Sequence, residues 1–208
     1  MKISHSDLEA CRRNPRQWVS AKLFSDGSGP RYGYNQAIKN AIYTYHRTSI
    51  PADSKKYLAE ALKKFTNIKR SLECSETLES YLQWAEAYPN VFASWRIHLK
   101  LILHRDILLG GEISRVDIDI KVDQYMAIIL GPKPMDWKDQ LRIPLIQYAI
   151  ASQFHRPVDQ VRVGYQDING SDLQTTQCDE TDIREALKEG RKIGIAVHGE
   201  VTRQMGNL

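Results

Sequence analysis

The hydrophobic period of this chain changes from about 3.6 residues to 2 near residue 90. Before that point, apolar residues recur at helical spacing in three segments, over residues 34–47, 53–72 and 75–88. After it, they alternate with polar residues from Trp95 to Leu103 and again from Val116 to Ile120, the pattern of half-buried strands. We therefore expect an α/β (α+β) chain with a helical N-terminal half and a sheet built by the second half.

The second half continues with two more strands and one amphipathic helix. We expect a strand over 124–130, a helix over 137–154 and a strand over 160–166 that ends in a DINGSD turn. A loop ending in Lys133 connects the first of these strands to the helix. This order predicts a mixed four-stranded sheet flanked by helices.

The two ends of the chain carry weaker signals. Ser4 and Asp7 resemble a capping box that starts a short helix, which Pro15 then interrupts. The segment SDGSGPRYG over 25–33 has the composition of a loop. Near the C-terminus we expect a helix from Thr181 to Lys188. An ambiguous segment then follows, broken by three glycines, Gly190, Gly194 and Gly199.

Length and composition favour a single domain over 1–208, because 208 residues with 42% hydrophobic residues suffice for one core. Its parts would be a mainly helical segment over 1–90, a sheet core over 91–166 and an extension over 167–208. Apolar runs stay far below the about 20 residues that cross a bilayer, which predicts a cytoplasmic protein without a membrane partner. The three cysteines, Cys11, Cys74 and Cys178, lack metal-binding spacing and are expected to be reduced.

Positive charge gathers in the first third of the chain. Residues 1–72 hold 14 Lys/Arg and 5 Asp/Glu, against 15 and 20 in the remainder. Such a segment attracts phosphate backbones, although an acidic protein would explain it equally well. Arg12, Arg13 and Arg16 could grip a phosphate backbone while Trp18 stacks on a base. The alternative is a solvated helix with Trp18 packed into the core.

Four sequence pieces span about residues 3–166. They are ISHSDLEACRRNPRQWV, RYGYNQAIKNAIYTYHR, GGEISRVD and YMAIILGPKP with the following DQLRIPLIQYAIA. Together they resemble the RecB-like and CRISPR-associated exonuclease branch of the PD-(D/E)XK nuclease superfamily. The order of a helix, three strands, a helix and a further strand is similar to the αβββαβ core of that superfamily. The resemblance implies a restriction-endonuclease-like core.

The departures from that pattern fall on positions to which the family assigns chemistry. The expected helix histidine is missing, since Gly33 is followed by Tyr, Asn, Gln and Ala. The metal-binding acids of the second and third strands fall on Ser114 and Gly131, whereas Lys133 and Gln140 are retained. The tyrosine expected after Gln140 is Pro144. Cleavage of a phosphodiester by a divalent metal needs hard anionic ligands, which a serine and a glycine do not supply.

If the motif is aligned in a shifted register, an active enzyme remains an alternative. The acids Asp106, Glu112, Asp117 and Asp119 lie nearby and could bind Mg or Mn together with Lys121 or Lys133. Two of these carboxylates would then have to converge on one cation. In the unshifted register, Asp117, Asp119 and Asp123 are solvent-facing residues of a strand and its turn.

The function expected from these observations is a pseudonuclease, a catalytically inactive PD-(D/E)XK-fold protein that binds no metal cofactor. Its catalytic positions would be vestigial, at Ser114, Gly131, Lys133 and Gln140, and it would bind DNA through Arg12, Arg13, Arg16 and Lys133. The resemblance implies an architectural subunit with a helicase or nuclease partner in DNA repair or antiviral defence. The alternatives are an active metal-dependent nuclease and a protein-interaction module that binds no nucleic acid.

Overall fold

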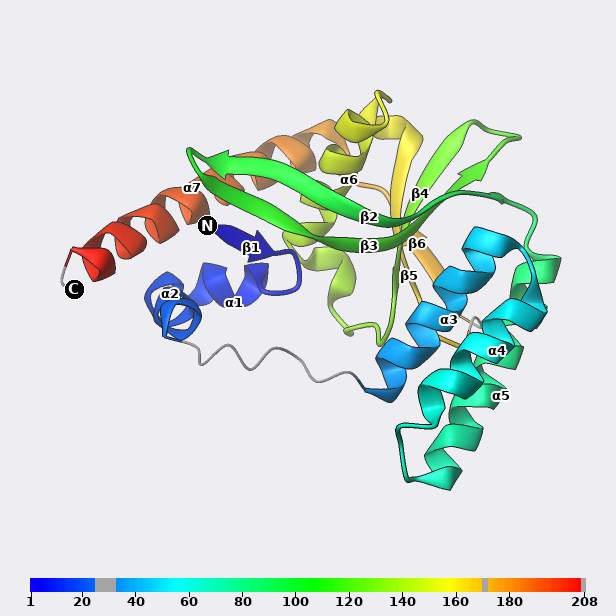
Figure 1. Cartoon of the computed structure of the whole chain (residues 1–208). Helices are drawn as coiled ribbons and strands as arrows, with labels where there is room; N and C mark the ends of the chain where they lie inside the picture. Colours follow the sequence, from blue (N-terminus) through cyan, green and yellow to red (C-terminus); the bar gives the residue numbers. More distant parts are fainter. Residues whose placement is uncertain (25–32, 170–171, 207–208) are drawn as a thin grey trace.

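The computed structural model describes residues 1–24, 33–169 and 172–206, and it shows an α/β protein (Figure 1). The predicted loop over 25–33, apart from Gly33, lies outside the described residues, as do two residues of the predicted DINGSD turn. In chain order the elements are β1 (Lys2–Ser4), α1 (Leu8–Arg13), α2 (Pro15–Leu23), α3 (Tyr34–Thr48), α4 (Pro51–Leu62), α5 (Ile68–Ala87), β2 (Val91–His104), β3 (Ile107–Asp119), β4 (Gln124–Leu130), a 3₁₀ helix (Trp137–Asp139), α6 (Arg142–Gln153), a second 3₁₀ helix (Val158–Gln160), β5 (Val161–Gln166), β6 (Leu173–Thr176) and α7 (Glu180–Met205).

The sheet is mixed, and it has six strands where the sequence predicted four. β2 and β4 are antiparallel to β3, β5 runs parallel to β4, and β6 is antiparallel to β5. β1 pairs in parallel with the start of β3. The two additional strands, β1 and β6, have three and four residues, too few for an alternating pattern to be recognised in the sequence. The predicted order of three strands, a helix and a strand is confirmed from β2 to β5.

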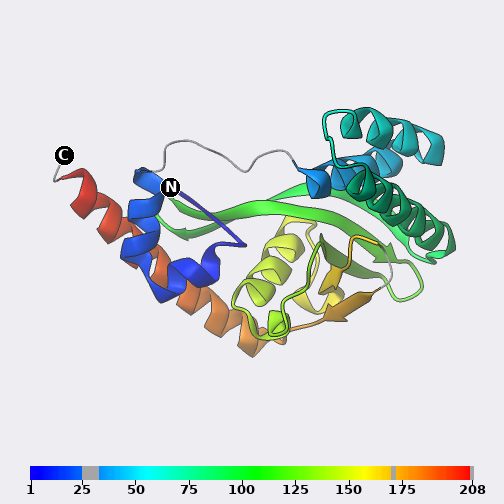
Figure 2. The same cartoon turned by 90° about the horizontal axis from the view of Figure 1, so that it is seen from below.

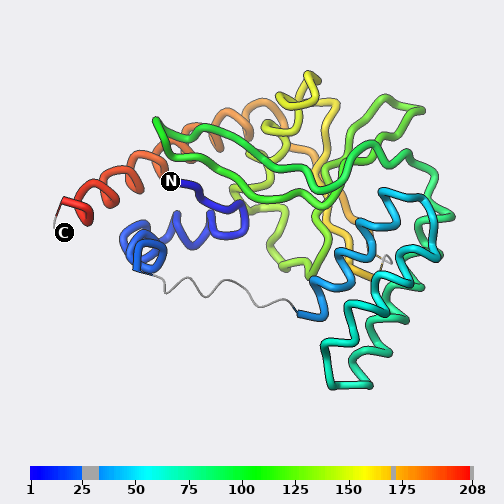
Figure 3. The backbone as a smooth tube through the Cα atoms, in the orientation of Figure 1, coloured from blue at the N-terminus to red at the C-terminus, as the bar shows by residue number. Residues whose placement is uncertain are grey.

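Helices cover both faces of the sheet, as the view from below shows (Figure 2). α6 packs on one face over a core that includes Ile113, Val116 and Ile146. α3, α4 and α5 lie on the opposite face and share a second core around Tyr81 and Leu130. A third core joins α1, α2 and β1 to α7, and the backbone trace shows both chain ends in that region (Figure 3).

The boundary between the second and third predicted helices is wrong. The sequence suggested helices over 53–72 and 75–88, whereas the structure has α4 ending at Leu62 and α5 running from Ile68 to Ala87. Asn67 begins α5, because its side chain accepts a hydrogen bond from the backbone N–H of Arg70. Leu72, the last residue of the second predicted helix, lies in α5 and is 59% exposed.

α7 continues from Glu180 to Met205 through the three glycines that were expected to break it. A methyl group at Gly194 would lie 2.8 Å from the Cβ of His104, and one at Gly190 would lie 3.2 Å from a methyl carbon of Leu103. These two glycines therefore allow the helix to pack closely against β2 rather than ending it. A capping box of Asp179 and Asp182 starts the helix.

Two further helix predictions need correction. Ser4 belongs to β1, and α1 begins after Asp7 without a side-chain cap, so the predicted capping box is wrong. The helix expected over 137–154 is a short 3₁₀ helix followed by α6 from Arg142 to Gln153.

Within the described residues, no helix combines the length and the hydropathy needed to span a membrane.

Candidate functional site

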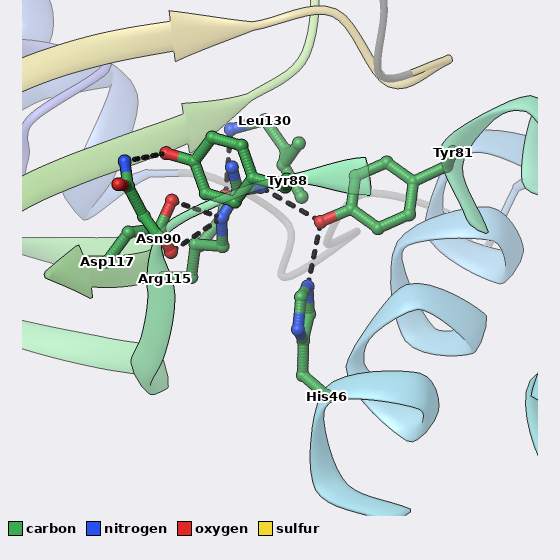
Figure 4. A network of polar contacts seen from close by, with 8 residues as sticks. His46, Tyr81, Tyr88, Asn90, Arg115, Asp117 and Leu130 are labelled. Carbon is green, nitrogen blue, oxygen red and sulfur yellow. Dashed lines mark hydrogen bonds and ion pairs between the residues drawn. The ribbon is translucent and has the colours of Figure 1, made fainter. Parts of the chain in front are cut away.

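The two positions that lack their expected acids lie where β3 and β4 separate. These strands pair from Asp119 and Gln124 as far as Arg115 and Ile128. Beyond that pair, the hydroxyl oxygen of Ser114 accepts a hydrogen bond of 2.9 Å from the backbone N–H of Leu130 (Figure 4). Ser114 is 5% exposed, and its hydroxyl thus satisfies a backbone donor that the diverging strand would otherwise leave unpaired.

Glu112 is the acidic residue on β3 next to this point, and both of its carboxylate oxygens have partners. The Tyr43 hydroxyl of α3 donates to Oε1 at 2.9 Å, and Nε of Arg96 from β2 donates to Oε2 at 3.0 Å. Burial and the Glu112 charge raise the pKa of Tyr43, while the neighbouring Ser114 hydroxyl opposes the rise. Glu112 is therefore held in a network of hydrogen bonds rather than left open to a ligand.

The amine of Lys39 lies beside Gly131. A Cβ built on Gly131 would be 3.6 Å from Nζ of Lys39, which makes this amine the nearest atom to the place where an acidic side chain would begin. Lys39 is half-buried, and burial lowers the pKa of its amine while the charge of Glu112 opposes this. Lys39 forms no ion pair or hydrogen bond with any of the residues that the structure describes. A positive charge thus lies where the family pattern would place a metal ligand.

His5 completes the cluster from the segment after β1. Its Nε2 lies 3.2 Å from the carbonyl oxygen of Glu112, and its burial lowers the pKa of the imidazole. Gly111 permits this contact, since a Cβ there would lie 2.5 Å from the imidazole, and its φ of 121° also favours glycine. Lys39 and Arg142 also act on the imidazole through their positive charges. The carboxylate of Asp7 opposes these two charges at the imidazole.

This set of side chains does not suit a divalent metal ion. Mg²⁺ and Mn²⁺ prefer several oxygen ligands, usually including carboxylates. Here the Glu112 carboxylate is bound by Tyr43 and Arg96, an amine acts on it, and the Asp7 carboxylate is paired with Lys22. Among residues 1–24, 33–169 and 172–206, no group of three or more His, Cys, Asp and Glu side chains is arranged to hold a metal ion.

Lys133 and Gln140, the two positions that match the motif, form hydrogen bonds with other residues. Nζ of Lys133 donates to Oδ2 of Asp172 at 2.7 Å, a contact that lowers the pKa of this exposed carboxyl. Gln140 accepts from Nε of Arg142 at 2.7 Å and donates to Asp136 at 2.9 Å. Gln140 thus contacts Arg142, whose charge acts on His5, whereas the described partner of Lys133 is Asp172.

The acids of the shifted register are spread along β3. Asp106 lies in the turn before the strand and Asp119 at its other end, roughly 40 Å apart for an extended strand of this length. Glu112 and Asp117 are five positions apart, or about 16 Å. Lys121 is two positions after Asp119, and its backbone N–H donates to the Asp119 carboxylate. The structure therefore does not bring a pair of carboxylates together with a lysine.

Asp117 is not the solvent-facing residue that the alternating pattern suggested. It is fully buried, and both of its carboxylate oxygens accept from Nε of Arg115 at 2.9 Å. Arg115 also donates to the Tyr81 hydroxyl at 2.9 Å, and this hydroxyl lies 2.7 Å from Nε2 of His46 (Figure 4). The prediction failed because α5 covers this face of the strand.

The three N-terminal arginines lie on α1 and α2 and are exposed. Arg12 is 3.6 Å from Glu9 and 3.5 Å from Glu189. Arg13 and Arg16 have no ion pair with the described part of the chain. Trp18 is 8% exposed and belongs to the core beside α7, so its indole is packed rather than available for stacking on a base.

Sequence reasoning missed Lys39, Tyr43 and Arg96 as members of this site. One signal was present, because Lys39 and Tyr43 are four residues apart and so share a face of the helix that follows Gly33. That helix was considered only for a histidine in its first turn. Nothing in the sequence pattern marks Arg96, which has a φ of 52° in the middle of a strand.

Replacing Gly131 with alanine should lower the free energy of unfolding by about 1–3 kcal/mol. Gly131 has a φ of 142°, a conformation that L side chains rarely adopt. Gly199→Ala is the matched control, because nothing lies within 4 Å of its added methyl and a helical alanine should stabilise by about 0.5–1 kcal/mol. Urea denaturation of both variants checks this, and equal stabilities would contradict the strained backbone.

Comparisons with known proteins give weak similarities. No family model and no curated protein matches the chain. One similar solved structure is a candidate exonuclease from Eubacterium rectale, 8% identical with a TM-score of 0.47, over 83% of this chain and 70% of that one. Another, SSO0001, is 8% identical with a TM-score of 0.31, over 89% and 85%. These values assign no family.

Proposed function

We propose that this protein binds DNA through the basic cluster where β3 and β4 separate, and that it does so without a metal ion and without cleavage. The observation that carries the proposal is the amine of Lys39 beside Gly131, next to a carboxylate already bound by Tyr43 and Arg96. A half-buried amine whose pKa is lowered by burial gains from an anionic partner. A phosphate group of the DNA backbone is such a partner.

The sequence resemblance to RecB-like proteins supports the same proposal and extends it. In this extension the chain is an architectural subunit of a complex for DNA processing, repair or defence, and a helicase or nuclease partner supplies catalysis. Arg13 and Arg16 would add a second, exposed contact with the DNA backbone. Fold and charge alone do not determine such a role, so the direct test is binding and cleavage.

The test is fluorescence anisotropy of the full chain with single-stranded DNA at about 50 mM salt, with EDTA and then with Mn²⁺. We expect binding in EDTA, no gain in affinity with Mn²⁺ and no cleavage product. Lys39→Ala should weaken binding about tenfold, because it removes a charged hydrogen bond to phosphate. Lys39→Arg should retain binding. Lys192→Ala is the control, since this lysine is 75% exposed on α7.

Two results would overturn the proposal. Cleavage that requires Mn²⁺ and disappears in Glu112→Gln would establish the active nuclease instead. Absence of binding to any DNA at this salt concentration would favour the protein-interaction module.

A further inference from the structure

A small pocket adjoins the Glu112 cluster on the side of α3 and α4. Its volume is about 250 Å³, and three aromatic side chains line it, Tyr43 of α3, Tyr57 of α4 and Trp95 of β2. Arg47 and Arg96 are the basic residues of the lining, Arg96 being paired with Glu112, and no acidic residue belongs to the lining that the structure describes. Pockets for drug-sized ligands usually measure about 300–1,000 Å³, so this one suits a single ring system.

Two of the three aromatic side chains of the pocket are partly open to a ligand. Trp95 is 38% exposed and Tyr57 is 37% exposed, whereas Tyr43 is 7% exposed. Trp95 also departs from the alternating pattern of its strand, in which Ile97 and Leu99 are buried. Asn40 positions Tyr57, since its side-chain amide donates to the Tyr57 hydroxyl at 3.3 Å.

The backbone at Arg96 holds its guanidinium in place at a conformational cost. Its φ of 52° is a left-handed value inside a strand, and such strain is stored mainly at functional sites. The guanidinium lies 5.1 Å from the ring centroid of Tyr43 and bonds Glu112. Arg47 is exposed and forms no ion pair with the part of the chain that the structure describes. It is thus free to meet an anion.

We propose that this pocket takes one unpaired nucleotide of a DNA strand, with the base against Trp95 and Tyr57 and its phosphate at Arg47. This deepens the proposed function and rests on it, because Tyr43 and Arg96 belong to both sites and one strand can cross both. Aromatic side chains bind bases by stacking, and arginines bind the adjoining phosphates. A base in a duplex is already stacked and paired, so the pocket selects single-stranded DNA.

The experiment compares two labelled single strands of equal length, oligothymidylate and a strand of abasic sites, by fluorescence anisotropy with the full chain. We expect wild type to prefer oligothymidylate about tenfold. Trp95→Ala should remove this preference, and Trp95→Phe should keep most of it because a ring remains. Phe24→Ala, which removes an exposed aromatic side chain outside the pocket, should leave it unchanged.

The outcomes separate the two proposals. Equal wild-type affinity for both strands would overturn the nucleotide pocket while leaving DNA binding in place. A preference for oligothymidylate that survives in Trp95→Ala would have the same consequence. Lys39→Ala should weaken binding of both strands equally. Failure to bind either strand would overturn the pocket and the proposed function together.

Discussion

Replacing Arg115 with methionine should lower the free energy of unfolding by about 3–5 kcal/mol. For a chain of this size, that loss corresponds to a fall in Tm of roughly 10 °C. The variant removes the partner of Asp117, whose carboxylate is fully buried and accepts two hydrogen bonds from Arg115. The carboxylate would then remain in the core without a compensating charge.

The surroundings of the pair leave the Asp117 carboxylate dependent on the charge of Arg115. Its side chain is 1% exposed, and its guanidinium carbon lies 5.0 Å from the ring centroid of Trp84 and 5.5 Å from that of Phe92. The hydroxyl of Tyr88 also hydrogen-bonds the Asp117 carboxylate, but it is neutral and does not compensate the charge. Asp117 therefore has no other cation among the described residues to replace Arg115.

Three variants test this by thermal and urea denaturation. The double variant Arg115→Met, Asp117→Leu should recover much of the lost stability, because an apolar pair of similar volume often replaces a buried ion pair without loss. Arg203→Met, which removes an exposed arginine paired with Glu200, should cost within about 1 kcal/mol. A double variant no more stable than Arg115→Met would contradict the argument from an unpaired charge.

The pair of Arg115 and Asp117 also shows where sequence reasoning reached its limit. The motif GGEISRVD was recognised, and the alternation of Val116 and Ile118 correctly predicted a strand. Alternation distinguishes the two faces of a strand but does not say which faces are covered. The N-terminal helices cover the polar face here, so an acid that looked exposed is buried.

Long elements with a clear period were predictable, and elements defined by tertiary contacts were not. The order from β2 to β5 followed from hydrophobic period and turn residues. β1 exists because its three residues pair with Leu108, Leu109 and Gly110, more than 100 positions away. α7 passes through Gly190 and Gly194 because β2 lies against them. A local pattern contains none of this information.

The same distinction between local pattern and tertiary contact applies to the candidate site. Ser114 and Gly131 could be located because a familiar motif surrounds each of them. The amine beside Gly131 comes from Lys39, 92 positions earlier, and only the folded chain brings the two together. The residue at a motif position can be read from a sequence, whereas the group that lies beside it can be seen only in the folded chain.

Lowering the pH from 7 to 5 should destabilise the protein by about 2 kcal/mol through His46 alone. Burial, with the nearby charge of Arg115, lowers the pKa of His46 to about 3. An unfolded histidine titrates near 6.5, so between about 6.5 and 3 the unfolded chain binds a proton that the folded chain does not. Stability is therefore present above pH 6.5 and falls as the pH drops, by about 1.4 kcal/mol per unit.

The hydrogen bonds around His46 also fit a neutral imidazole. Arg115 donates to the Tyr81 hydroxyl, which can in turn donate to Nε2 of His46, so the chain of donors runs from the cation to the imidazole. A protonated imidazole would have to reverse the last bond, and it would place a second positive charge beside Arg115. Phe92, with its ring centroid 4.4 Å from that of His46, offers no anion.

Urea denaturation at pH 7, 6 and 5 measures this loss. His46→Gln keeps a side chain able to bond Tyr81 but cannot take up a proton, so it should lose about 2 kcal/mol less than wild type between pH 7 and 5. His98→Gln removes an exposed imidazole and should follow wild type. Other histidines, including the buried His5, act alike in all three proteins, and the difference between variants therefore isolates His46. Parallel pH dependences of wild type and His46→Gln would show that the imidazole takes up a proton as readily in the folded chain as in the unfolded chain, which would contradict a neutral His46 that accepts from Tyr81.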